Sequence, residues 1–279
     1  MKNVKQIALC ALVTGGLLFT ACQKEEISNE VQEVNSEPTK EQLSQLFDMG
    51  VNIHDVTIQK LSLLDGSSAD YFVSGDITVP VEGFENLPKL ETNTNGTKQY
   101  HTNNLISSSN RTIDVLGYTG GGGQGLNSTN QEALRRAVAN FNNVNSTLNM
   151  RLSFGTNYQA ADLVVYVRWD LGGGGLAGFP SGGKAYKWAR IGPRVSNYGV
   201  TYATHVITHE MGHCIGLRHT DWFARSCDGS NEGAGSVGAI HIPGTPTGID
   251  RTSIMISCAT GNENGVLNSN DVTAIEYLY

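Results

Sequence analysis

The stretch His209-Glu210-Met-Gly-His213-Cys-Ile-Gly216-Leu-Arg-His219 carries most of the information about the fold. Residues four apart on an α-helix lie about 40° from each other around its axis, so His209 and His213 project side by side. Two imidazoles at this spacing can bind one Zn²⁺ ion at about 2.0–2.1 Å. Glu210 is rotated by about 100° from His209, which lets it reach a metal-bound water without being a ligand.

A third imidazole follows the helix. Gly216 allows the chain to leave the helix with a positive φ, and the turn then directs His219 to the metal from another side. Three neutral imidazoles leave a fourth position for water, which is typical of a catalytic zinc site rather than a structural one. We therefore expect one zinc ion that lowers the pKa of its water toward about 7, with Glu210 as general base.

The motif resembles that of the metzincin zinc peptidases. Met255, in Ser253-Ile-Met-Ile-Ser257, resembles the methionine of the Met-turn that lies under the metal in those enzymes, although ordinary core packing is the alternative interpretation. Within the clan, the motif followed by His219-Thr-Asp-Trp222 looks most like the bacterial dual-action "HEIGH" metallopeptidase family. The resemblance covers residues 111–279.

This resemblance implies a zinc-dependent endopeptidase that acts on protein or peptide substrates. It also implies an α+β or α/β fold, in which a twisted mixed sheet packs on the active-site helix and the Met-turn. Two departures limit it. Ser257 stands where astacin-type enzymes have a tyrosine ligand, and no cysteine lies between Cys22 and the motif, which excludes a cysteine-switch propeptide.

The N-terminus is typical of an exported lipoprotein. Residues 1–21 combine a short basic start with an apolar stretch, as in a signal peptide, and Thr20-Ala21-Cys22 resembles a bacterial lipobox. Acyl chains on Cys22 would make a stable lipid anchor in the membrane. Gln23-Lys-Glu-Glu26 resembles an export tag for the outer face of the outer membrane in Bacteroidetes-type bacteria. A plain secretory signal and a solvated linker are the alternatives.

Composition and pattern divide the rest of the chain. Residues 22–45 are polar and form a tether, and residues 46–110 form an N-terminal subdomain or propeptide with a linker. Nothing in that region suggests chemistry, and whether it is removed stays open. Residues 111–279 are the expected peptidase domain. The net charge of −7 excludes binding of nucleic acid through excess Lys and Arg. The sequence does not indicate an oligomeric state.

Periodicity predicts the main elements. Thr39 caps a short helix, residues 70–81 form a strand, and Asn127 or Ser128 caps a helix that runs to about Val144. Residues 184–195 alternate weakly, which indicates an exposed edge strand. The metzincin resemblance implies that this strand would align the substrate backbone as an added strand. The remaining predicted elements are strands over 113–118, 150–154 and 162–169 and a C-terminal helix within 267–279.

Three cysteines remain after export, because Cys10 leaves with the signal peptide and Cys22 is lipidated. They cannot all pair. A disulfide between Cys227 and Cys258 would tie the loop after His219 to the predicted Met-turn, whereas Cys214 suits a small buried apolar role.

Other polar residues give no clear site. Asn262–Asn264 and Asn268–Asp271 offer oxygen ligands for Ca²⁺ but lack EF-hand spacing, and a turn and a helix cap explain them equally well. Outside the motif, the sequence leaves four histidines with structural roles: His54, His101, His205 and His241.

A different function class also fits. The chain could be a non-catalytic surface lipoprotein that contains zinc and binds a polymer or host glycoprotein. Glu210 argues against this alternative, because a purely structural site has no use for that carboxylate and is normally closed by a fourth protein ligand.

Overall fold

The computed structural model describes residues 37–49, 51–86, 99–233, 239–246 and 248–279. These residues belong to one compact unit, which extends from Asn35 to Tyr279. The predicted signal peptide and the lipidated Cys22 lie outside the described residues. Among the described residues, every helix is too short or too polar to cross a bilayer.

The centre of the structure is a five-stranded sheet with the order β6-β5-β7-β9-β8. Neighbouring strands are parallel except for β8, which runs antiparallel to β9 at the edge. The strands are β5 (Thr112–Tyr118), β6 (Asn149–Gly155), β7 (Leu163–Val167), β8 (Gly175–Leu176) and β9 (Trp188–Ile191). This mixed sheet confirms the predicted fold class, and β5, β6 and β7 confirm the predicted strands.

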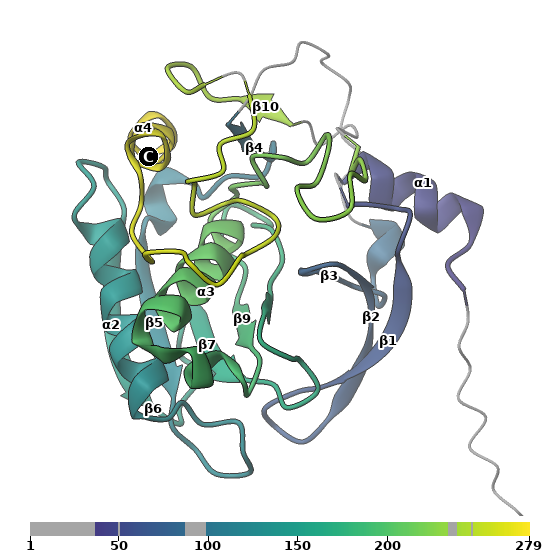
Figure 1. The fold of residues 1–279 in the computed structure, drawn as a ribbon. Coiled ribbons are helices and arrows are strands. Elements are labelled where there is room, and N and C mark those ends of the chain that lie inside the picture. Colours follow the sequence, from purple (N-terminus) through teal and green to yellow (C-terminus); the bar gives the residue numbers. More distant parts are fainter. Residues whose placement is uncertain (1–36, 50, 87–98, 234–238, 247) are drawn as a thin grey trace, which may run out of the picture. The chain divides into compact units, whose positions relative to one another are not determined.

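Helices α2 (Ser128–Asn142) and α3 (Gly199–Cys214) pack side by side over one face of this sheet (Figure 1). The side chain of Asn127 caps α2, which selects one of the two caps that the sequence allows. The apolar stripe of α2, including Leu134 and Phe141, joins the inward-facing residues of the sheet and of α3 in one core. Helix α4 (Ser269–Leu278) contributes Ile275 to the same core and confirms the predicted C-terminal helix.

The N-terminal region adds a helix and a small sheet. Thr39 caps α1 (Lys40–Asp48) through a capping box, as predicted. Strands β1 (Thr57–Ser62), β2 (Ser68–Ser74) and β3 (Ile77–Pro80) form an antiparallel sheet. The prediction of one strand over 70–81 is therefore wrong, because the chain reverses at Gly75, where φ is +56°, and Asp76. This turn proves central to the site.

Residues 99–106 pack with the later part of the chain. Strand β4 (Tyr100–His101) pairs with β10 (Ile240–His241). The carbonyl oxygen of Tyr100 accepts a hydrogen bond from the Arg218 backbone N–H at 2.8 Å, and Ile106 lies in the main core. Short 3₁₀ turns complete the described elements: η1 (Phe84–Asn86), η2 (Ser108–Asn110) and η3 (Val195–Tyr198).

The prediction of an exposed edge strand over 184–195 is wrong. Strand β9 lies between β7 and β8, so the edge belongs to β8. The pattern is misleading because Arg190, a polar residue in the alternation, is fully buried. Its guanidinium donates hydrogen bonds to the hydroxyls of Tyr166, at 2.8 Å, and Thr78, at 3.2 Å. The N-terminal region supplies Thr78, so sequence periodicity alone could not reveal this burial.

We predict that Phe141→Ala lowers the free energy of unfolding by about 3–5 kcal/mol, because the ring is fully buried between α2 and the sheet. Chemical denaturation measures this loss. Tyr277→Ala, at a side chain that is 58% exposed, is the control and should change stability by less than about 0.5 kcal/mol. Equal effects of the two variants would contradict the assignment of the core.

Candidate metal centre

Helix α3 presents the first part of the motif. His209 and His213 lie one turn apart on it, both buried, and Glu210 follows His209. The helix ends at Cys214, and Gly216 then adopts a φ of +106°, which favours glycine. The chain reverses there and places His219, also buried, against the other two imidazoles.

The three histidines direct the same nitrogen toward one point. The Nε2 atoms of His209 and His213 are 3.0 Å apart, and that of His219 lies 3.3 Å and 3.2 Å from them. Asp76, from the turn between β2 and β3, completes the group. Its Oδ2 atom lies 3.1 Å from His209 Nε2, 3.0 Å from His219 Nε2 and 3.9 Å from His213 Nε2.

Each imidazole is oriented through its other nitrogen. His209 Nδ1 lies 2.8 Å from the carbonyl oxygen of Ile254, and His213 Nδ1 lies 2.9 Å from that of Leu217. His219 Nδ1 lies 2.6 Å from the carboxylate of Glu232. Because all three partners are acceptors, Nδ1 is the donor in each ring. The Nε2 lone pairs are therefore left to face one another, as in metal-bound histidines.

These four ligand atoms fit a zinc ion. Around zinc at about 2.0–2.1 Å, tetrahedral ligands are separated by about 3.3–3.4 Å. The measured separations run from 3.0 to 3.9 Å. Imidazole nitrogens and a carboxylate oxygen are also a donor set that zinc accepts. The group thus has the composition and the spacing of a site that could hold a metal ion.

Charge reinforces the need for a cation. Burial is the main cause that lowers the pKa of His213 to about 4. His209 and His219 add to the shift and Asp76 opposes it, so this ring stays neutral. Burial acts against protonation of His219 too, but Asp76 and Glu232 outweigh it and raise the pKa of this ring. A proton can be shared by only two of these atoms, whereas one metal ion can bind the three Nε2 atoms and Asp76 Oδ2 together.

Glu210 lies beside this group without joining it. Its side chain is buried, and its Oε2 atom has no hydrogen-bond partner among the described residues. Burial, aided by the negative charge of Asp76, raises the pKa of Glu210. A Cβ atom at Gly175 on strand β8 would collide with the Glu210 carboxylate, so glycine is needed where the edge strand passes it. An unpartnered buried carboxylate fits a site where water binds.

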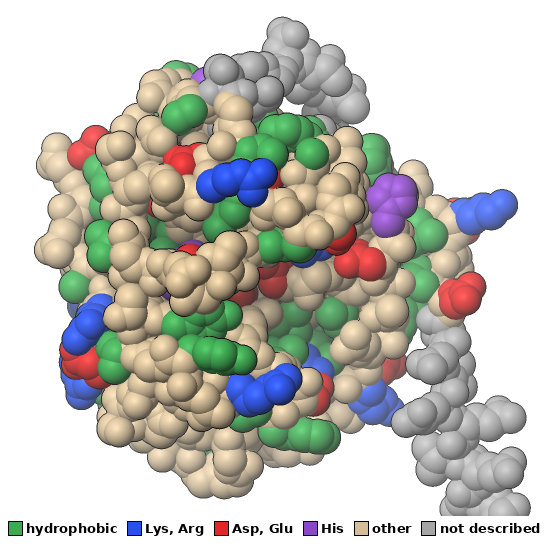
Figure 2. Space-filling model, in the orientation of Figure 1, with side chains coloured by type: hydrophobic (Ala, Val, Ile, Leu, Met, Phe, Trp, Pro, Cys, Tyr) green, Lys and Arg blue, Asp and Glu red, His purple; other side chains and the backbone are tan. Residues whose placement is uncertain are grey.

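A cleft of about 290 Å³ opens in front of this group. Its lining includes Asp76, His209 and Glu210 and, on its walls, Gly175 and Tyr202. The space-filling view shows acidic side chains near the centre of this face (Figure 2). Strand β8, through Gly175, and helix α3, through Tyr202, therefore both line the cleft.

A family model for the dual-action HEIGH metallo-peptidases matches residues 71–279. The chain belongs to this family. The match starts within the N-terminal region, at Tyr71, and so includes Asp76 as well as the histidine motif.

Other comparisons add little to this assignment. Among the solved structures that match, "Structure of Myroilysin" shares 14% identity with this chain, with a TM-score of 0.39. The match covers 61% of this chain and 80% of that one. No curated protein matches.

In this HEIGH metallo-peptidase, residues 253–257 pack against helix α3. Met255 is buried, and its Sδ atom would be only 2.5 Å from a Cβ atom at Gly212. The buried Asp271 of α4 fixes this turn, because its carboxylate accepts hydrogen bonds from Ser253 Oγ at 2.5 Å and from the Ile254 N–H at 3.0 Å. The same Ile254 orients His209 through its carbonyl, so α4 supports the metal centre indirectly.

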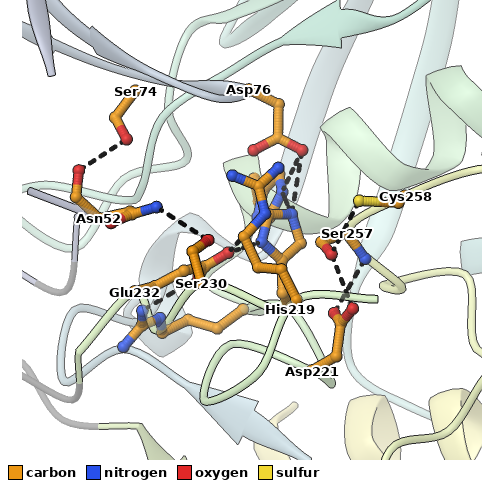
Figure 3. A network of polar contacts seen from close by, with 12 residues as sticks. Asn52, Ser74, Asp76, His219, Asp221, Ser230, Glu232, Ser257 and Cys258 are labelled. Atoms are coloured by element: carbon orange, nitrogen blue, oxygen red, sulfur yellow. Dashed lines mark hydrogen bonds and ion pairs between the residues drawn. The ribbon is translucent and has the colours of Figure 1, made fainter. Parts of the chain in front are cut away.

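The loop after His219 is fastened to the same turn. Asp221 accepts hydrogen bonds from the N–H and hydroxyl of Ser257, at 3.0 and 2.7 Å (Figure 3). A disulfide joins Cys227 to Cys258, with a Cα–Cα distance of 5.7 Å, and Cys214 is a buried free thiol.

The remaining candidates from the sequence lie apart from the four ligand atoms. His205 lines the cleft, and burial lowers its pKa to about 4. His101 is buried against the Thr102 carbonyl. The proposed calcium ligands serve local structure: Glu263 accepts hydrogen bonds from Thr260 and Gly261, and Asn268 caps α4.

Sequence reasoning missed four acidic residues that shape the centre: Asp76, Asp221, Glu232 and Asp271. Asp76 is 133 positions before His209, in a region where no residue suggested chemistry, and that prediction is wrong. Asp271 did carry a signal as part of a helix cap, but the cap motif says nothing about the turn of Met255 that this carboxylate also holds.

We predict that Glu232→Gln weakens metal binding by about 10–100-fold, because it removes the carboxylate that orients His219. Competition with a chromophoric chelator measures the dissociation constant. Glu276→Gln, at an exposed position on α4, is the matched control and should leave it unchanged. Equal affinities of the two variants would exclude this role for Glu232.

Proposed function

We propose that this HEIGH metallo-peptidase is a zinc-dependent endopeptidase that cleaves proteins or peptides. The observation that carries the proposal is the position of Glu210, a buried carboxylate with an unpartnered oxygen next to three converging Nε2 atoms. His209, His213 and His219 would hold the zinc, and the turn of Met255 would serve as the Met-turn. Zinc supplies a Lewis acid that acidifies water and polarises a peptide carbonyl.

In this proposal Glu210 moves the proton. It accepts a proton from the attacking water, whose oxygen forms a bond to the carbonyl carbon of the substrate. It then donates that proton to the amide nitrogen as the carbon–nitrogen bond breaks. The burial that raises the pKa of Glu210 suits both steps, because a carboxyl group with a raised pKa holds the proton long enough to deliver it.

Strand β8 would position the substrate. It is the edge of the main sheet and borders the cleft, and Gly175 brings its backbone close to Glu210. A substrate chain that adds to this edge would be held by its own backbone groups. Such binding uses backbone N–H and C=O groups along the substrate rather than its termini, which supports cleavage of internal peptide bonds.

The proposal includes a lipid anchor at Cys22 in a bacterial cell envelope, in the outer membrane and exposed at its surface. Support comes from the sequence alone: an apolar stretch preceded by Lys2 and Lys5, followed by small residues before the cysteine. Residues 22–45 would tether the peptidase to the membrane.

One observation favours the alternative, a non-catalytic zinc-containing lipoprotein. Asp76 stands where a fourth protein ligand would close a structural site. That alternative, however, gives no role to Glu210, whose burial without a partner for Oε2 costs stability.

We predict that Glu210→Gln keeps its zinc but lowers the cleavage rate of a denatured protein by about 10²–10⁴-fold, because the amide cannot accept the proton. Glu210→Gln and its control are each made in the unaltered chain and in a chain that also carries Asp76→Ala, since Asp76 lies at the ligand group. Elemental analysis checks zinc, and Glu276→Gln is the control. Chelator-insensitive cleavage, or equal rates for Glu210→Gln and its parent in the Asp76→Ala background, would refute the proposal.

A further inference from the structure

The turn between β2 and β3 delivers Asp76 to the ligand group from outside the peptidase sheet. Ser74 ends β2 and Ile77 begins β3, so only Gly75 and Asp76 form the reversal. The Arg225 side chain packs against Gly75, where its Nη1 would be 3.1 Å from a Cβ atom. Gly75 and Asp76 therefore both line the cleft.

The same segment occupies the edge of the peptidase sheet next to β8. The Ala177 N–H donates a hydrogen bond to the Asp76 carbonyl at 2.8 Å, and the Thr78 N–H donates one to the Ala177 carbonyl at 2.7 Å. Ile77 and Ala177 thus form a parallel bridge. These are the backbone groups to which an added substrate strand would bind.

Further contacts hold the turn in place. The Ser74 hydroxyl donates to the Asn52 carbonyl at 2.7 Å, and the Asn52 amide contacts Ser230 Oγ at 3.4 Å (Figure 3). Ser230 belongs to the loop that also supplies Glu232, the partner of His219. From the other side, Phe179 packs on the apolar cluster of the N-terminal region. The turn is thus fixed to both walls of the site.

We propose that residues 74–78 are a built-in inhibitor of the peptidase. Asp76 takes the ligand position that water and substrate need, and the backbone of Asp76–Thr78 takes the place of the substrate strand. This inference rests on the proposed function. An intramolecular occupant has an effective concentration in the millimolar range, so it competes with free substrate for the site until the segment is displaced.

The test measures access to the metal rather than cleavage. The full chain is loaded with Co²⁺, and acetohydroxamate is titrated while the visible absorption of the metal is followed. Asp76→Ala should bind acetohydroxamate about tenfold or more tightly than the unaltered chain, because the apparent affinity scales with the fraction of molecules whose site is open. Asp76→Asn keeps the shape of the side chain and guards against a folding defect, and it should also open the site.

Asp70→Ala is the matched control, since Asp70 is exposed on β2 of the same sheet, and it should bind acetohydroxamate as the unaltered chain does. Equal affinities of the unaltered chain and both Asp76 variants, with metal bound in all of them, would overturn the inference. If the Asp76 variants open the site but no variant cleaves protein, the inhibitor contact survives and the proposed peptidase activity fails. If the unaltered chain and the Asp76 variants cleave at equal rates, the activity survives and the inhibitor role fails.

Discussion

The metal centre depends on three hydrogen bonds that lie behind it. They join the Nδ1 atoms of His209, His213 and His219 to the Ile254 and Leu217 carbonyls and to the carboxylate of Glu232. They fix each ring and leave three Nε2 lone pairs within 3.3 Å of one another. Such lone pairs repel one another unless a cation lies between them. The fold therefore holds the three rings in an arrangement that becomes favourable when a metal ion binds.

Four parts of the structure position the three histidines and the groups around them. Helix α3 is packed into the main core and sets the spacing of the first two histidines. Helix α4 reaches the turn of Met255 through Asp271, and the disulfide between Cys227 and Cys258 fastens the loop after His219 to the same region. The N-terminal hairpin approaches from the other side and adds Asp76. One site is thus assembled from four parts of the chain that are distant in sequence.

The sequence predicts what depends on local spacing. The positions of His209 and His213 follow from helical periodicity, and a helix cap at Asn127 or Ser128 follows from residue type. It does not predict the role of Asp76 or the burial of Arg190, because these depend on contacts that the N-terminal region makes with His209 of α3 and with Arg190 of β9. Weak alternation around Arg190 indicates an exposed side chain only if no other part of the chain covers that face of the strand. The order of strands in the sheet cannot be predicted from the sequence of any one strand.

X-ray absorption at the zinc edge of the metal-loaded protein tests the central claim most directly. The account predicts about one zinc per chain, with a first shell of nitrogen and oxygen at about 2.0–2.1 Å and the outer-shell scattering of three imidazoles. A sulfur ligand at about 2.3 Å would instead assign the metal to a thiolate such as Cys214. That result, or a purified protein that binds no stoichiometric metal, would contradict the account.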